Sequence, residues 1–194
     1  MPAAVLAGGA SRRMGAGVTK AALPFGRSTL AAHQTDRLAE IFEPVWLVLR
    51  EAPAFSFGPA RLLFDTDPER SALSGLARAL AEAEDHVFVL AVDLPVVPVP
   101  VLAAIAERSL ESGAAAVLPE HAGRLEPLAG VWRRQALPAA LEHAREGKRS
   151  LRALAEAVGA EPFPEATWRL LDPSGNAFAN LNTVQDWETA RARA

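Results

Sequence analysis

The chain has 194 residues, of which half are hydrophobic and 22% are charged, and it carries a formal net charge of −3 with no cysteine. This size fits a single domain spanning residues 1–194, and the missing cysteines exclude disulfides, thiolate metal sites and cysteine nucleophiles. The slight acidic excess, the lack of an apolar run of roughly 18 residues and the lack of a signal-peptide pattern together predict a cytoplasmic protein that binds neither nucleic acid nor membrane.

Predicted strands and helices alternate along the chain. Residues 3–6 form a short apolar run that ends at two glycines, and a region of about twenty residues rich in glycine and basic side chains follows it. Further strands are predicted from short apolar runs, and helices from apolar residues three and four apart. They are a helix over 30–42, strands over 45–49 and 61–64, a helix over 73–84, a strand over 87–92, a helix around 102–106, strands over 114–118 and 128–132, helices around 137–144 and 151–158, and a last helix capped by Thr183 and Asp186.

The order of these elements indicates the fold class. The run over 87–92 is uninterrupted apolar sequence, which is typical of a strand buried on both faces in a parallel sheet. The run over 128–132 is a candidate antiparallel strand, and the segments 162–164 and 173–175 are predicted as ordinary turns. Strands separated by helices of this length predict an α/β fold with a mainly parallel sheet and helices on both faces.

The segment that leaves the first strand is the first candidate site, because ligands of open α/β sheets bind beyond the carboxyl ends of the strands. Gly8 and Gly9 let the backbone approach a ligand closely, and Arg13 and Lys20 add positive charge suited to a polyphosphate. The lysine spacing is not that of a P-loop, and the segment has no Gly-x-Gly-x-x-Gly. The alternative interpretation is a flexible basic loop.

Two aspartates end other predicted strands. Asp93 follows the 87–92 strand, where an unpaired buried carboxylate would be costly, so a Mg²⁺ site or a turn cap explains it better than core packing. Asp65 follows the 61–64 strand, where turn chemistry before Pro68 is the alternative.

Polar residues nearer the C-terminus are weaker candidates. Asn180 and Asn182 lie two residues apart and share one face if the segment is extended, and their uncharged amides can hold a phosphate without opposing its charge. The alternative is a helix entry before Thr183. Arg149 could reach an anionic substrate, although the start of a solvated helix is the preferred interpretation.

Four motifs together resemble the molybdenum cofactor guanylyltransferases of the MobA type. They are Leu6-Ala-Gly-Gly-Ala-Ser-Arg-Arg-Met-Gly15 followed by Lys20, Leu73-Ser-Gly-Leu76, Val92-Asp-Leu-Pro95, and Phe178-Ala-Asn-Leu-Asn-Thr183. Their order and approximate spacing match the family over nearly the whole chain. The resemblance implies a doubly wound three-layer sandwich with a Rossmann-like nucleotide-binding half.

The resemblance also implies an activity. It is the Mg²⁺-dependent transfer of GMP from GTP to the phosphate of molybdopterin or of molybdenum cofactor, which gives the guanine dinucleotide cofactor and pyrophosphate. Transient contact with other cofactor-biosynthesis proteins is implied as well. By the same resemblance, Asp93 binds Mg²⁺; Asp93, Lys20 and Arg13 are catalytic; Asn180 and Asn182 hold the pterin; and the nucleotide contacts are Leu6, Ala7, Gly8, Gly9, Lys20, Asp65 and Asp93.

Three departures from the family pattern keep alternatives open. Ser71-Ala72 stands where the family usually has Gly-Pro. Arg50 lies in the segment that ends the second strand, where the family often has an asparagine. The interval from Gly15 to Lys20 is one residue longer than usual. The first two lie near the expected base-binding region. The alternatives are therefore a related nucleotidyltransferase that uses CTP or a sugar-phosphate acceptor, and a catalytically inactive nucleotide-binding regulator.

Overall fold

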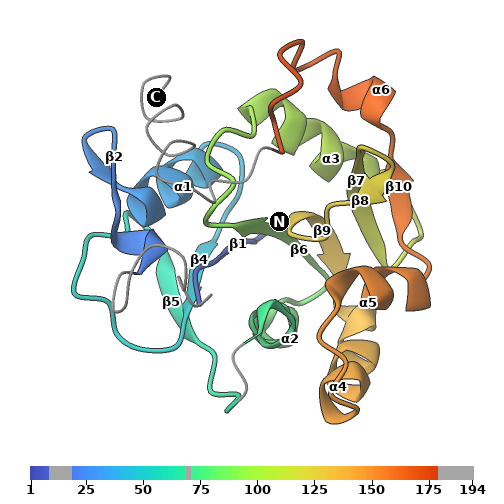
Figure 1. Cartoon of the computed structure of the whole chain (residues 1–194), viewed down its shortest axis with the longest axis horizontal. Helices are drawn as coiled ribbons and strands as arrows, with labels where there is room; N and C mark the ends of the chain where they lie inside the picture. The colour runs from blue at the N-terminus through green and yellow to red at the C-terminus, as the bar shows by residue number, and fades with distance from the viewer. Residues whose placement is uncertain (9–18, 69–70, 179–194) are drawn as a thin grey trace.

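The computed structural model describes residues 1–8, 19–68 and 71–178, which form a sheet with helices on both sides (Figure 1). The strands are β1 Ala3–Leu6, β2 Pro24–Phe25, β3 Ser28–Thr29, β4 Val45–Leu49, β5 Arg61–Phe64, β6 His86–Ala91, β7 Ala116–His121, β8 Arg124–Leu125, β9 Ala129–Arg133 and β10 Glu161–Phe163. The helices are α1 Leu30–Ala39, α2 Ala72–Glu82, α3 Val99–Glu111, α4 Leu137–Arg145, α5 Leu151–Ala157 and α6 Glu165–Trp168, with single 3₁₀ turns η1 Lys20–Ala22 and η2 Arg134–Ala136.

Within the described residues, the main sheet has eight strands in the order β10-β7-β9-β6-β1-β4-β5, with β8 paired to β7. The pairs β1–β4, β1–β6, β4–β5 and β7–β10 are parallel. Strand β9 runs antiparallel to both of its neighbours, β6 and β7, as predicted for that segment. The chain first adds β4 and β5 on one side of β1 and then β6 on the other, so the strand order reverses at β1.

Alternate residues of the central strands serve two separate cores. Ala3 and Val5 of β1 face the core built with α1, α3 and α6, whereas Ala4 and Leu6 face the core built with α2, α4 and α5. Figure 1 shows these two sets of helices on opposite sides of the strands. The predicted three-layer α/β sandwich with a mainly parallel sheet is therefore confirmed. None of the helices in the described stretches is both long and apolar enough to cross a bilayer.

Several element boundaries and one segment differ from the prediction. Helix α1 ends at Ala39, not at residue 42, and the predicted final helix lies outside the described residues. The segment 162–164, predicted as a turn, belongs largely to β10. Proline is tolerated in a strand at the edge of a sheet, where one side of the backbone needs no partner, and among the described strands β10 pairs only with β7. The small elements β2, β3, β8 and α6 are too short to leave a periodic pattern.

Gly130 is where the sheet leaves no room for a side chain. A Cβ atom added there would lie 2.5 Å from the carbonyl oxygen of Val117 and 2.9 Å from Cδ2 of Leu118. We expect Gly130→Ala to lower the free energy of unfolding by about 1–3 kcal/mol, because β9 and β7 must separate to admit the methyl group. Urea unfolding measures this, with Gly113→Ala as the control, since a Cβ at Gly113 meets nothing within 4 Å. Equal stabilities of the two variants would contradict the packing described.

Candidate active site

The carboxyl ends of four neighbouring parallel strands bring the candidate residues together. Hydrogen bonds beyond the strand ends extend this alignment: the amide of Ala7 donates to Val48, that of Asp65 to Leu49, and that of Val92 to Leu6. Four residues that follow these strands therefore meet at one edge of the sheet: Gly8 after β1, Arg50 after β4, Asp65 after β5 and Asp93 after β6. This edge includes β1, where the strand order reverses, and α/β proteins bind ligands at such points.

A cavity of about 180 Å³ opens at this edge. It contains the ends of the strands, the ammonium-bearing Lys20 and the first turn of α2, and apolar side chains from β4, β6 and the segment before β9 form its walls. The lining residues are Leu6, Ala7, Gly8, Lys20, Val48, Asp65, Ser71, Ala72, Gly75, Ala91, Val92, Asp93 and Leu128. We call it the first cavity.

Lys20 and Asp93 form an ion pair inside the first cavity, with Nζ of the lysine 3.0 Å from Oδ2 of the aspartate. Their side chains are 19% and 27% exposed, so both can meet an incoming ligand. A cation and a carboxylate at such close range would attract an anionic ligand and its counter-cation respectively. The turn η1, which begins at Lys20, places the ammonium here despite the longer interval from Gly15.

Helix α1 holds the turn that carries Asp93 in place. Gln34 donates through Nε2 to the carbonyl of Ala91 at 3.2 Å, and Arg37 donates through Nη1 to the carbonyl of Pro95 at 2.6 Å and through Nη2 to that of Val97. Burial lowers the pKa of Arg37, and its guanidinium donates to the carbonyl oxygens of two residues that follow Asp93 in the chain. Hydrogen bonds from side chains of α1 therefore hold the backbone both before and after Asp93.

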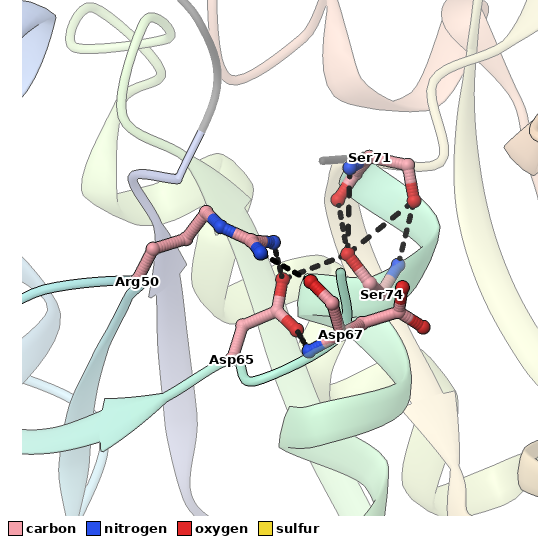
Figure 2. Close-up of polar contacts among 5 residues, drawn as sticks. All are labelled: Arg50, Asp65, Asp67, Ser71 and Ser74. Atoms are coloured by element: carbon pink, nitrogen blue, oxygen red, sulfur yellow. Dashed lines mark hydrogen bonds and ion pairs between the residues drawn. The ribbon is translucent and has the colours of Figure 1, made fainter. Parts of the chain in front are cut away.

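Asp65 lies at the other end of the first cavity in a network of polar contacts (Figure 2). Its Oδ2 accepts from Ser74 Oγ at 2.7 Å and from Arg50 Nη1 at 3.3 Å, and its Oδ1 accepts from the amide of Asp67 at 3.0 Å. Ser71 caps α2 by accepting from the amide of Ser74 at 3.0 Å. The carboxylate is only 7% exposed but is well provided with donors.

The structure places six of the residues predicted from the sequence on this one cavity: Leu6, Ala7, Gly8, Lys20, Asp65 and Asp93. The predicted residues Gly9, Arg13, Asn180 and Asn182 lie outside the described residues, so their roles stay predictions. The sequence did not reveal that Arg50 and Ser74 contact Asp65. The departure from the family pattern at Arg50 was the one feature of the sequence that pointed to this contact.

A second cavity of about 360 Å³ lies beside the first and shares Ala72, Ala91 and Leu128 with it. Its remaining wall comes from the turn after β6, the segment before β9 and the start of α5, and consists of Leu94, Glu126, Pro127, Arg149, Ser150, Leu151 and Arg152. Ser150 caps α5, so the predicted helix start is correct, and the neighbouring Arg149 faces this cavity as well. The two adjacent cavities could hold two ligands side by side.

Among the described residues, no group of three or more histidine and acidic side chains gathers as a metal site. Asp93 and Asp65 both line the first cavity but do not belong to such a group, and Asp93 is the one that pairs with the ammonium of Lys20. Mg²⁺ commonly binds proteins through one or two carboxylates and takes its other ligands from substrate phosphates and water. The residues present fit that kind of cation, held jointly with a phosphorylated ligand.

Comparison with known proteins identifies a matching family and similar relatives. The family model described as MobA-like NTP transferase domain matches residues 3–161. A probable molybdenum cofactor guanylyltransferase of Chloroflexus aggregans is 32% identical over 99% of this chain and 94% of its own length.

Two solved structures share the fold. A molybdopterin-guanine dinucleotide biosynthesis protein A from Archaeoglobus fulgidus superposes with a TM-score of 0.85 at 22% identity, covering 100% of this chain and 98% of its own. A 2-C-methyl-D-erythritol 4-phosphate cytidylyltransferase from Thermus thermophilus reaches a TM-score of 0.68 at 20% identity, covering 98% of this chain and 96% of its own.

Proposed function

This chain belongs to the MobA-like NTP transferase family, and on that premise we propose that it transfers GMP from GTP to the phosphate of molybdopterin or of molybdenum cofactor. The products are the guanine dinucleotide cofactor and pyrophosphate. The observation that carries the proposal is the Lys20–Asp93 pair at 3.0 Å in a cavity that shares part of its wall with a second one. The relationship to guanylyltransferases over nearly the full chain supports GTP in preference to CTP.

The first cavity divides into a phosphate end and a nucleoside end. Lys20 begins η1 and Asp93 follows β6, while Asp65 follows β5, on the far side of β1 and β4. We assign the triphosphate to Lys20 and to the backbone at Gly8, with Gly9 and Arg13 as predicted further contacts. The nucleoside then extends toward Asp65 and the first turn of α2.

Mg²⁺ is proposed to bind at Asp93 together with the phosphates. When bound, it would neutralise charge on the phosphate oxygens. Asp93 is well suited to hold it, because the backbone on both sides of this residue is fixed by Gln34 and Arg37. Lys20 would exchange its carboxylate partner for a phosphate oxygen when GTP enters.

The reaction itself needs no covalent intermediate on the enzyme. An oxygen of the acceptor phosphate attacks the α-phosphorus of GTP, a new P–O bond forms, and the bond to the bridging oxygen breaks so that pyrophosphate leaves with the electron pair. The contribution of the chain is alignment of the two substrates and stabilisation of developing negative charge. Lys20 supplies a positive charge where the pyrophosphate departs.

The acceptor is assigned to the second cavity. Arg149 and Arg152 line it, which suits a phosphorylated pterin, and Arg152 also pairs with Glu126 at 3.3 Å. The cavity adjoins the first through Ala72, Ala91 and Leu128, so an acceptor phosphate there can approach the α-phosphorus. Asn180 and Asn182 remain proposed pterin contacts on the basis of the sequence motif.

We expect Arg149→Met to raise the KM for the pterin acceptor about tenfold or more, with the affinity for GTP unchanged, because a charge-assisted contact to the acceptor phosphate is lost. Steady-state kinetics with each substrate varied in turn measures this. Arg145→Met is the matched control, since Arg145 is an exposed arginine in the same region that lines neither cavity. An unchanged acceptor KM in Arg149→Met would remove Arg149 from the acceptor site.

Calorimetric titration with GTP, CTP and ATP in the presence of Mg²⁺ tests the choice of nucleotide. GTP should bind most tightly. Tight binding of CTP with no binding of GTP would support the cytidylyl alternative instead. Pyrophosphate release on addition of the pterin acceptor separates an active transferase from a regulator that binds nucleotide but has lost catalysis.

A further inference from the structure

The contacts of Asp65 are unusual for a group that only stabilises the fold. Its carboxylate is 7% exposed, and its partner Arg50 is 18% exposed, so both charges are largely removed from water. Buried ion pairs add little to the free energy of unfolding, because the cost of desolvation offsets most of their attraction. Apolar side chains of similar volume often stabilise a protein as much. A network that lines a ligand cavity is more readily explained by a role toward the ligand.

The three donors on Asp65 come from three different elements, so the orientation of its carboxylate is closely defined. Arg50 follows β4, the amide of Asp67 belongs to the loop after β5, and Ser74 is in the first turn of α2 (Figure 2). Arg50 also donates through Nη2 to the carbonyl of Asp67, which ties that loop to the end of β4. The plane of the carboxylate therefore has little freedom to turn.

The same contacts determine what Asp65 can still bind. An ionised carboxylate has about four acceptor positions, two on each oxygen. Donors from the described residues fill both positions on Oδ2 and one on Oδ1. No further donor from the described residues contacts Oδ1, so one of its positions is available to a ligand in the first cavity, and it can accept only from an N–H or O–H group.

Arg50 also lies beside Gly8, which follows β1. A Cβ atom added at Gly8 would lie 3.6 Å from Cγ of Arg50, so the aliphatic part of this side chain packs beside the backbone assigned to the triphosphate. Its positive charge balances Asp65 close to the expected path of a highly anionic ligand.

We propose that Arg50 and Ser74 are positioning residues that hold the Asp65 carboxylate so that it recognises a single N–H or O–H donor of the bound nucleoside. This inference rests on the proposed function, because it requires a nucleotide in the first cavity. The donor is either an N–H of the base or a hydroxyl of the ribose. Arg50 and Ser74 act through Asp65 and need not touch the ligand themselves.

The test compares binding of GTP and of inorganic triphosphate, each with Mg²⁺, by calorimetry. Inorganic triphosphate occupies only the phosphate end, so it reports on Lys20 and Asp93 without a nucleoside. Arg50→Met and Ser74→Ala should weaken GTP about tenfold or more and leave inorganic triphosphate within about twofold of the unaltered protein. Ser74→Thr should regain much of the lost GTP affinity because it keeps the hydroxyl donor, and Arg50→Lys should regain part of it because one ammonium replaces the two nitrogens that bind Asp65 and Asp67.

A matched control removes another arginine–carboxylate pair on the neighbouring strand. Arg61 of β5 pairs with Glu82 and is 61% exposed, outside both cavities. Arg61→Met should leave both ligands unaffected. Titration with ITP, 1-methyl-GTP, 2′-deoxy-GTP and 3′-deoxy-GTP identifies the donor group of the nucleoside. The unaltered protein should bind the analogue that lacks this donor more weakly than GTP. Arg50→Met should bind that analogue and GTP equally.

Three results would overturn the inference: equal weakening of GTP and inorganic triphosphate by Arg50→Met, no weakening of either, or no analogue that the unaltered protein discriminates from GTP. Each would leave the proposed function standing, provided that the unaltered protein binds GTP. Absence of GTP binding by the unaltered protein is a failure of the proposed function itself.

Discussion

Replacement of Asp93 by asparagine is expected to lower the turnover number about a thousandfold, which corresponds to roughly 4 kcal/mol of transition-state stabilisation. The amide keeps the shape of the side chain but removes the negative charge that would hold Mg²⁺. The fold should survive, because the Lys20–Asp93 pair is partly exposed, at 19% and 27%, and pairs of that kind contribute little to stability. Pyrophosphate release measures turnover, and circular dichroism checks the fold.

Binding of Mn²⁺, followed by electron paramagnetic resonance in the presence of GTP, gives a second readout that does not depend on turnover. Asp93→Asn should weaken it strongly. Asp85→Asn is the control, since Asp85 precedes β6 at the opposite end from Asp93 and is 64% exposed. Full turnover in Asp93→Asn would remove Asp93 from the mechanism.

Replacement of Lys20 by methionine is expected to weaken GTP about 10- to 100-fold and to lower turnover as well. The ammonium lies 3.0 Å from Oδ2 of Asp93, where it can transfer its hydrogen bonds to a phosphate oxygen, and charge-assisted bonds of this type carry the larger energies. Lys20→Arg should rescue poorly, because a guanidinium is broader than an ammonium and prefers a planar partner. Calorimetry with GTP and with inorganic triphosphate measures the loss.

The sequence contains two lysines, and the second provides the control. Lys148 pairs with Glu146 at 2.9 Å and is 59% exposed, and Lys148→Met should leave GTP binding unchanged. If Lys20→Met bound inorganic triphosphate as tightly as the unaltered protein, the triphosphate would have to lie elsewhere in the cavity.

Much of the fold was predictable because its central strands are buried on both faces. The run 45–49 matches β4 residue for residue, and all of its side chains are buried, as a continuous apolar run bounded by polar and turn residues predicts. Strand β10 was not predictable. It contains Pro162 and has three residues, so its pairing depends on the presence of β7 rather than on a pattern of its own.

The candidate site was predictable to the extent that strand ends determine it. Gly8, Asp65 and Asp93 were recognised as residues that follow strands, and the parallel sheet brings them to one edge. The contact between Arg50 and Asp65 could not be predicted, because it depends on the pairing of β4 with β5 and on the direction of a long side chain. The same is true of Arg149, whose cavity is formed by segments distant in the chain.

The central claim is the transfer of GMP to a pterin phosphate, and one measurement tests it most directly. The protein is incubated with Mg²⁺, molybdopterin and GTP labelled at the α-phosphate, and in parallel with labelled CTP. We predict that the label passes from GTP into a dinucleotide of the pterin with one equivalent of pyrophosphate released, and that CTP gives no such product. Transfer from CTP but not from GTP, or binding of GTP with no transfer, would contradict the claim.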